Sequence, residues 1–191
     1  MLEVRIHGRG GQGNVVAAYL LATVAINEGR FAQAFPAFGA ERRGAPVTAF
    51  VRIAKDAFRR RSQVREPAFL IVQDQSLLHV EGVTDGLPAD GGILVNSSLS
   101  SRVLSQQLGR EAIAMPATNL AKELLGRPVP NTALLAGFLA LTHMLPLESL
   151  VSSLAERFSG EMLERNTRLI EEAAKQVPPG HWKEVAHAHG A

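Results

Sequence analysis

A glycine-rich turn near the N-terminus is the first feature with chemical potential. Its glycines at positions 8, 10 and 13 satisfy the pattern G-x-G-x-x-G, between an alternating segment, Leu2–Ile6, and an apolar segment, Gln12–Glu28. Such a turn between a strand and a helix lets the backbone approach a phosphate, and the helix N-terminus attracts the negative charge. The predicted cofactor-binding turn is Gly8-Arg9-Gly10-Gly11-Gln12-Gly13.

An ordinary NAD site is disfavoured by the segment that follows. A dinucleotide-binding unit places an Asp or Glu at the end of its second strand, where it holds the ribose hydroxyls. Here that strand is Phe31–Phe35 and contains no carboxylate; Glu28 precedes it and Glu41 follows in the next loop. No Gly-Lys-Ser/Thr sequence is present, which excludes a P-loop nucleotide triphosphatase. The glycines could alternatively serve only tight strand–helix packing.

A second candidate site lies in the loop from Pro36 to Pro46. It contains Glu41-Arg42-Arg43-Gly44, and the planar arginine side chain suits phosphates and carboxylates. Loops at the carboxyl ends of strands share one edge of an α/β sheet, so this loop is expected beside the glycine turn. The alternative is a solvated loop with internal ion pairs.

The remaining residues predict no catalytic set and no metal site. The histidines lack metal-ligand spacing with carboxylates, and the serines at positions 97–101 contain no G-x-S-x-G elbow. With no cysteine, the chain supplies no Cys ligand to an iron–sulfur cluster. Its 20 basic and 18 acidic residues do not favour nucleic-acid binding. The apolar stretch from Thr132 to Leu145 is too short to span a bilayer, and a cytoplasmic location is expected.

Strand and helix patterns alternate along most of the chain. They predict a single three-layer α/β/α domain with a mostly parallel sheet, a Rossmann-like opening unit and a helical C-terminal third. The expected strands are Leu2–Ile6, Phe31–Phe35, Val47–Ile53, Ala68–Val72, Ile93–Asn96 and Ala112–Met115. The expected helices are Gln12–Glu28, Ser100–Leu108, Thr118–Leu125, Asn131–Met144, Glu148–Phe158 and Gly160–Lys175.

Two further expectations concern less regular parts. Lys55-Asp56 predicts a hairpin turn, with a return strand over Phe58–Val64. Pro178-Pro179-Gly180 is expected to end regular structure, which leaves residues 181–191 frayed or ordered only by a partner. The resulting division is a domain over residues 1–177 and a tail over residues 178–191.

Several segments, in order, resemble the gamma subunit of the pyruvate:ferredoxin, or 2-oxoacid:acceptor, oxidoreductase family. The two most specific are Val4–Gly13, which includes the glycine turn, and Gln33–Pro46, which includes the double arginine. Shorter matches are Phe50–Ile53, Arg61–Val64, Val72–Asp74, Asn131-Thr132, Leu147–Leu150 and Arg165-Asn166, so the resemblance spans roughly residues 3 to 170.

The resemblance implies an enzyme that converts a 2-oxoacid and coenzyme A to acyl-CoA, carbon dioxide and a reduced acceptor. Thiamine diphosphate, Mg²⁺ and [4Fe-4S] clusters would lie in alpha, beta and delta-type (ferredoxin-like) subunits, with ferredoxin or another acceptor receiving the electrons. Residues 8–13 and 41–44 then become candidates for coenzyme A or for subunit contacts. Pyruvate is favoured, and a phenylglyoxylate-type enzyme is the alternative. A stand-alone nucleotide- or coenzyme-binding module is the alternative from another class.

Overall fold

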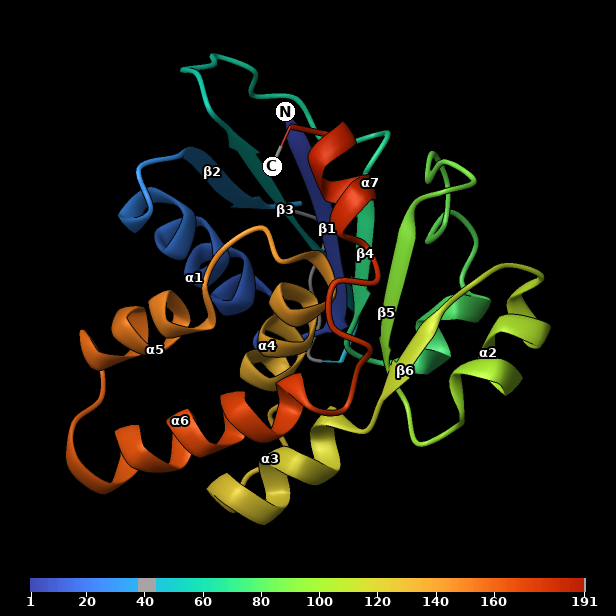
Figure 1. Ribbon diagram of the computed structural model, residues 1–191. Helices are drawn as coiled ribbons and strands as arrows, with labels where there is room; N and C mark the ends of the chain where they lie inside the picture. Colours follow the sequence, from blue (N-terminus) through green and yellow to red (C-terminus); the bar gives the residue numbers. More distant parts are fainter. Residues whose placement is uncertain (38–43, 191) are drawn as a thin grey trace.

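The computed structural model describes residues 1–37 and 44–190. The expected alternation of strands and helices is present (Figure 1). The strands are β1 (Leu2–Arg9), β2 (Phe31–Pro36), β3 (Pro46–Ala54), β4 (Phe69–Val72), β5 (Gly92–Asn96) and β6 (Ile113–Met115). The helices are α1 (Asn14–Asn27), the 3₁₀ turn η1 (Gln75–His79), α2 (Ser101–Leu108), α3 (Ala117–Leu125), α4 (Asn131–Thr142), α5 (Leu147–Ala155), α6 (Gly160–Ala174) and α7 (Lys183–Ala188).

The strands form one mixed sheet in the order β2-β3-β1-β4-β5-β6. β1, β4, β5 and β6 pair in parallel, whereas β3 pairs antiparallel with β1 on one side and with β2 on the other. The predicted α/β class with a mostly parallel sheet is therefore confirmed. The opening unit departs from a dinucleotide-binding unit in one respect, because β3 lies between β1 and β2.

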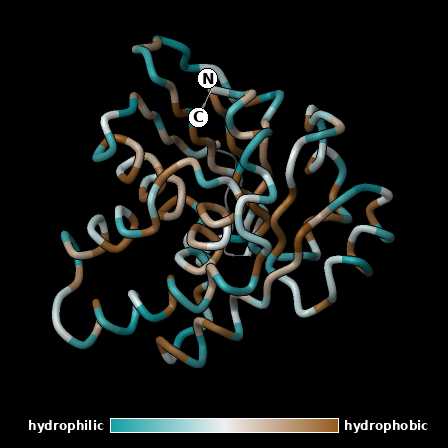
Figure 2. Tube along the Cα trace, in the orientation of Figure 1, coloured by the Kyte–Doolittle hydropathy of each residue, from teal (hydrophilic) through white to brown (hydrophobic). Residues whose placement is uncertain are grey.

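The side chains of β1 alternate between the two faces of the sheet, and both faces are largely buried. Leu2, Val4 and Ile6 are fully buried under α1 and α4, while Arg5 and His7 point to the opposite face. On that second face η1 packs against β4 and α2 against β6. The hydropathy colouring shows apolar strands in the middle of the molecule and hydrophilic turns around them (Figure 2).

The most buried helix is α4, as its composition predicts. Eleven of its residues are buried, between the sheet and the outer helices α1, α6 and α7. It follows Pro130 and ends at Thr142, and the next residue, His143, takes a left-handed conformation with φ of 49°. No helix in the described part of the chain has both the length and the apolarity that crossing a membrane requires.

Two local predictions are wrong. Residues 58–64 form no strand, because both edges of β3 are already paired, with β1 and with β2. The C-terminal residues do not fray: Lys183–Ala188 forms α7, and Trp182 and Ala186 are buried in the main core. Figure 1 shows the two chain ends side by side, in agreement with the closeness of Gly190 to Met1.

Candidate functional site

The glycine turn joins the carboxyl end of β1 to the first residue of α1, as the sequence predicts. The Arg9 backbone N–H donates to Gln12 Oε1 over 2.7 Å, and the Gln12 N–H donates to the Arg9 carbonyl over 3.0 Å. Gly11 and Gly13 take positive φ angles of 96° and 79°. Glycine is required at these two positions because other residues rarely adopt that backbone conformation.

The described end of the second loop lies directly beside this turn. The Gly10 N–H donates to the Ala45 carbonyl over 3.1 Å, and Arg9 Nη1 donates to the Gly44 carbonyl over 3.2 Å. The expected juxtaposition of the two segments therefore holds for Gly44. Glu41, Arg42 and Arg43 lie outside the described residues.

The Arg9 side chain is engaged within the chain. Its Nε donates to Asp74 Oδ2 over 2.8 Å and its Nη2 to Ser76 Oγ over 2.8 Å. Burial alone would raise the pKa of the Asp74 carboxyl, but the hydrogen bonds from Ser76 and Arg9 outweigh it and lower that pKa. Arg9 thus connects the turn to the loop after β4. Its guanidinium holds the turn against this loop through these hydrogen bonds. The spacing of residues along the sequence did not reveal this role.

The helices differ in how their N-termini are neutralised. α5, α6 and α7 each carry a glutamate in the first turn, at Glu148, Glu161 and Glu184. α1, α3 and α4 carry no acidic residue there, and no side chain of the N-cap residue caps them. At α3 and α4 one first-turn N–H is satisfied, by Asn96 and by Asn131 respectively. Among the helices of residues 1–37 and 44–190, α1 is thus the one whose N-terminus has neither a first-turn acid nor a side-chain hydrogen bond to a first-turn N–H.

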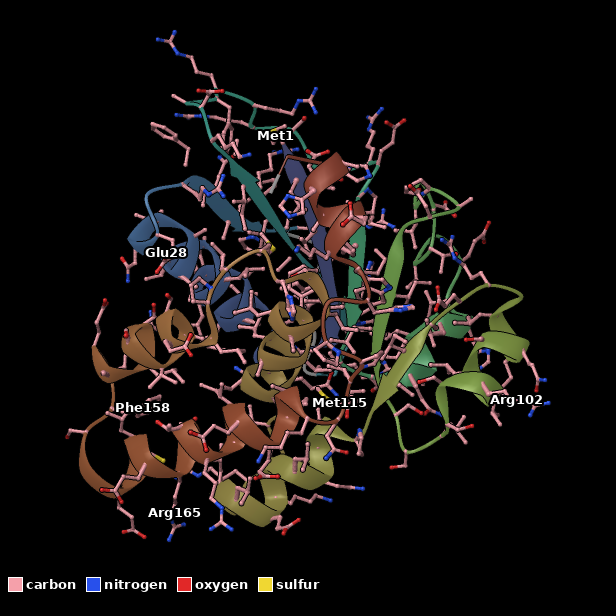
Figure 3. All side chains as sticks on the ribbon, in the orientation of Figure 1. Met1, Glu28, Arg102, Met115, Phe158 and Arg165 are labelled. Atoms are coloured by element: carbon pink, nitrogen blue, oxygen red, sulfur yellow. The ribbon has the colours of Figure 1, made fainter. Side chains whose placement is uncertain are left out.

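The N-terminus of α1 is surrounded by residues that no sequence motif had indicated as part of a site. A Cβ atom at Gly13 would lie 2.8 Å from Asn131 Nδ2, which places the start of α4 against the turn. A cavity of about 210 Å³ opens next to Asn131. Its lining includes Val16, Leu20, Leu125 and Phe158. Phe158 lies at the connection between α5 and α6 (Figure 3).

Gln73 is the least compensated polar side chain near this edge. It follows β4, has no exposed surface, and neither of its amide atoms has a hydrogen-bond partner within residues 1–37 and 44–190. Its backbone is fixed, since its N–H donates to the His7 carbonyl and its carbonyl accepts from Asn96 Nδ2. A buried amide without partners in the described part of the chain is rare in proteins.

His7 occupies the second face of the sheet, below the turn. It is 7% exposed, and its Nδ1 lies 3.4 Å from Thr48 Oγ1. Burial lowers the pKa of His7 to about 4, and the nearby positive charge of Arg5 adds to this effect. The imidazole is therefore neutral at physiological pH and forms part of the packed interior.

The burial of His7 predicts a pH-dependent stability. An unfolded chain takes up the proton near pH 6.5, whereas the folded chain does so only near pH 4, so the folded state loses stability as pH falls between these values. The full difference amounts to about 3 kcal/mol. The free energy of unfolding of wild type, measured by urea denaturation, is expected to fall by this amount relative to His7→Gln between pH 7 and pH 4. If the free energy of unfolding changed with pH in the same way in wild type and His7→Gln, the lowered pKa of His7 would be contradicted. His79→Gln serves as the control.

Among the described residues no group of three or more His, Asp or Glu side chains is arranged to hold a metal ion. This edge presents backbone N–H groups, a helix N-terminus and amide side chains, which are groups that can donate hydrogen bonds to an anion. The sequence model of one family, described as pyruvate ferredoxin/flavodoxin oxidoreductase, matches residues 3–176. The chain belongs to this family. The resemblance to its gamma subunit is confirmed by the relatives below.

Two relatives and one more distant structure illustrate the similarity. The "Pyruvate/ketoisovalerate oxidoreductases common subunit gamma" of Pyrococcus abyssi is 44% identical over 180 residues, which cover 93% of this chain and 97% of that one. The crystal structure of pyruvate oxidoreductase subunit PORC from Thermotoga maritima superposes with a TM-score of 0.83 at 32% identity, over 94% of this chain and 98% of that one. A 2-oxoglutarate:ferredoxin oxidoreductase from Magnetococcus marinus, solved with coenzyme A, shares the fold with a TM-score of 0.73 at 17% identity; the match covers 98% of this chain and 31% of that one.

Proposed function

We propose that this chain is the gamma subunit of a thiamine-diphosphate-dependent 2-oxoacid:acceptor oxidoreductase with pyruvate as its favoured substrate. The names of its relatives and their end-to-end match support this role. Thiamine diphosphate, Mg²⁺ and [4Fe-4S] clusters belong to the other subunits, and ferredoxin or another acceptor receives the electrons. A phenylglyoxylate-type substrate remains the alternative within the same chemistry.

Within that enzyme, we propose that this chain binds the phosphates of coenzyme A at the glycine turn. The observation that carries the proposal is the N-terminus of α1, which within the described residues has neither a side-chain cap nor a first-turn acid, whereas α5, α6 and α7 each carry a first-turn glutamate. A phosphate placed there accepts from free backbone N–H groups and meets the positive end of the helix dipole. Arg42 and Arg43 stay candidates for the same anion because of their side-chain chemistry.

The surroundings of the turn also suit the remainder of coenzyme A. The apolar cavity beside Asn131 provides walls for an uncharged part of the molecule, and exposed Arg127 and Arg157 lie at its margin. A site that combines apolar walls with a few polar groups is the usual form of a cofactor pocket. The absence of a side chain at Gly8 allows the turn to pack closely on Asn14, since a Cβ atom at Gly8 would lie 3.2 Å from Asn14 Cβ.

The Gly13→Ala variant tests this contact. A methyl group at Gly13 strains the turn and displaces Asn131, so we expect the KM for coenzyme A of the assembled enzyme to rise about tenfold or more, as for a lost charged hydrogen bond. The measurement is 2-oxoacid-dependent acceptor reduction by the reconstituted subunits. The isolated chain serves as the blank of this assay and is expected to be inactive.

Gly29→Ala is the matched control, because it lies at the other end of α1. Gly29 has a similar positive φ of 75°, but a Cβ atom there would meet nothing within 4 Å. Both variants should lose about 1 kcal/mol of stability from backbone strain, while only Gly13→Ala should change the KM. Equal KM values for coenzyme A in the two variants would contradict the proposal that coenzyme A binds at the turn.

A stand-alone nucleotide-binding module is less consistent with the fold. In a dinucleotide-binding unit the second strand lies next to the first, so that its terminal acid reaches the ribose. Here β3 separates β2 from β1, and β2 ends at Pro36 without a carboxylate. Calorimetric titration with NAD and FAD distinguishes the two functions: tight binding of either by the isolated chain would favour the module.

A further inference from the structure

A concentrated positive charge lies on the segment between β3 and β4, far along the sheet from the glycine turn. Residues 55–66, here named the arginine segment, hold five basic and two acidic side chains, although the whole chain has only 20 basic and 18 acidic residues. The basic residues are Lys55, Arg59, Arg60, Arg61 and Arg65. The segment contains no regular secondary structure and projects beyond β2 and β3 at the top of the view (Figure 1).

The arginine segment is anchored to the domain and is not a loose tail. Val64 is 3% exposed, and Arg60 Nη1 lies 3.7 Å from Glu3 Oε1 on β1. The same carboxylate accepts from Arg52 Nε over 2.6 Å. At the far end of the segment, the Arg65 carbonyl packs so closely on Gly86 that a Cβ atom there would lie 1.9 Å away. The charged side chains are thus presented from a fixed base.

Most of this charge is uncompensated within the part of the chain that the structure describes. Arg59, Arg61 and Arg65 are exposed, and none has an ion-pair partner among residues 1–37 and 44–190. Arg60 itself keeps 58% of its side chain exposed despite its contact with Glu3. Arginines in this state are available to carboxylates of another molecule.

Aromatic side chains and hollows accompany the arginines. A hollow of about 480 Å³ lies between Phe31 and Gln33 of β2 and residues 57–61, with Phe58 in its lining. Phe31 is 49% exposed. A second hollow, of about 510 Å³, lies on the other side of Arg60 and is lined by Glu3 and residues in the 60–66 range. Arginine and aromatic residues around such hollows are the composition of protein–protein contact sites.

β2 adds a backbone surface at the same place. It is the edge strand of the sheet, and among residues 1–37 and 44–190 it pairs only with β3, so one side of its backbone has no sheet partner there. Edge strands in soluble proteins are usually covered or protected by charge. The arginine segment supplies such charge, and it also selects which molecule can approach the edge.

We propose that the arginine segment, together with Phe31 and the free edge of β2, docks an acidic surface of another subunit of the same enzyme. A second copy of this chain is disfavoured, because a two-fold contact would bring the same positive segments together. A nucleic acid is disfavoured because the half-exposed aromatics and hollows suit side chains, and because the positive charge is confined to one short segment. The inference rests on the proposed function only in that the partner is a subunit of that enzyme.

The test compares two double charge reversals in the full chain. Arg59→Glu/Arg61→Glu changes the docking surface, whereas Arg102→Glu/Arg165→Glu makes the same change of charge on α2 and α6, well away from it (Figure 3). Affinity for the complex of the other subunits is measured by surface plasmon resonance at low and high ionic strength. We expect the first variant to bind at least about tenfold more weakly at low ionic strength, with a smaller difference at high, and the control to bind like wild type.

The possible outcomes separate the two proposals. Unchanged affinity of Arg59→Glu/Arg61→Glu, or an equal loss in both variants, would overturn the docking site. Binding of a random-sequence RNA that this variant abolishes, with subunit affinity intact, would assign the surface to nucleic acid instead. If wild type itself fails to bind the other subunits, the proposed function fails too. A normal KM for coenzyme A in Arg59→Glu/Arg61→Glu, once assembled at high protein concentration, shows that the coenzyme A site is independent.

Discussion

Replacing Trp182 with alanine is expected to lower the free energy of unfolding by about 3–5 kcal/mol, the usual cost of truncating a buried aromatic side chain. Trp182 is 3% exposed, and its ring lies 5.5 Å from that of Phe69, measured between centroids. Gly92 on β5 makes room for it, since a Cβ atom there would lie 2.7 Å from two atoms of the indole. The loss would leave a cavity over the middle of the sheet.

The same residue also closes the end of α4. The Trp182 N–H donates to the Leu141 carbonyl over 2.8 Å, and the Gly180 N–H donates to the Ala140 carbonyl over 2.8 Å. These carbonyls belong to the last turn of α4, where no further helical N–H is available to satisfy them. Deletion of residues 178–191 is therefore expected to cost at least as much as the single substitution.

Urea denaturation followed by circular dichroism measures this prediction. His187→Ala, an exposed position on α7, is the control and should stay within about 0.5 kcal/mol of wild type. A Trp182→Ala variant that unfolds within about 1 kcal/mol of wild type would mean that the C-terminal residues are not part of the core in solution.

The Gly86→Ala substitution is expected to cost more than about 3 kcal/mol or to prevent folding, because its clash cannot relax. A Cβ atom at Gly86 would lie 1.9 Å from the Arg65 carbonyl oxygen and 2.9 Å from the carbonyl carbon. Both are backbone atoms, so relief requires the chain itself to move. The positive φ of 72° adds the strain of a left-handed alanine, about 1 kcal/mol.

Gly82→Ala isolates the clash from the backbone strain. Gly82 has a comparable φ of 85°, but the nearest atom to its added Cβ would be Asp85 Oδ2 at 3.7 Å. This variant should lose only about 1 kcal/mol in a thermal or urea unfolding experiment. Equal stabilities of Gly82→Ala and Gly86→Ala would show that the contact between residues 65 and 86 is absent in solution. Because that contact fixes the arginine segment, a folded Gly86→Ala should also weaken subunit binding.

Local sequence patterns determined the elements that carry the site. The alternation in Leu2–Ile6 records that one face of β1 packs in the apolar core while the other, also largely buried, carries polar side chains. The continuous apolar run through α4 records burial on all sides of that helix. The glycine turn and its position between β1 and α1 could also be predicted from the sequence. Gly11 and Gly13 have positive φ angles, which glycine adopts without strain. The family resemblance added the subunit role, since it rests on several ordered motifs.

Only the tertiary structure decided contacts between distant segments. The sequence placed Arg9 in the turn but did not reveal Asp74 and Ser76 as its partners, 65 and 67 residues away. It predicted a return strand at residues 58–64 and a frayed tail, yet β3 has both edges paired and Trp182 lies in the core. The physical reason is that periodicity records whether a segment has an apolar side, whereas strand pairing and the burial of a single tryptophan depend on which surfaces remain free after the rest of the chain has packed.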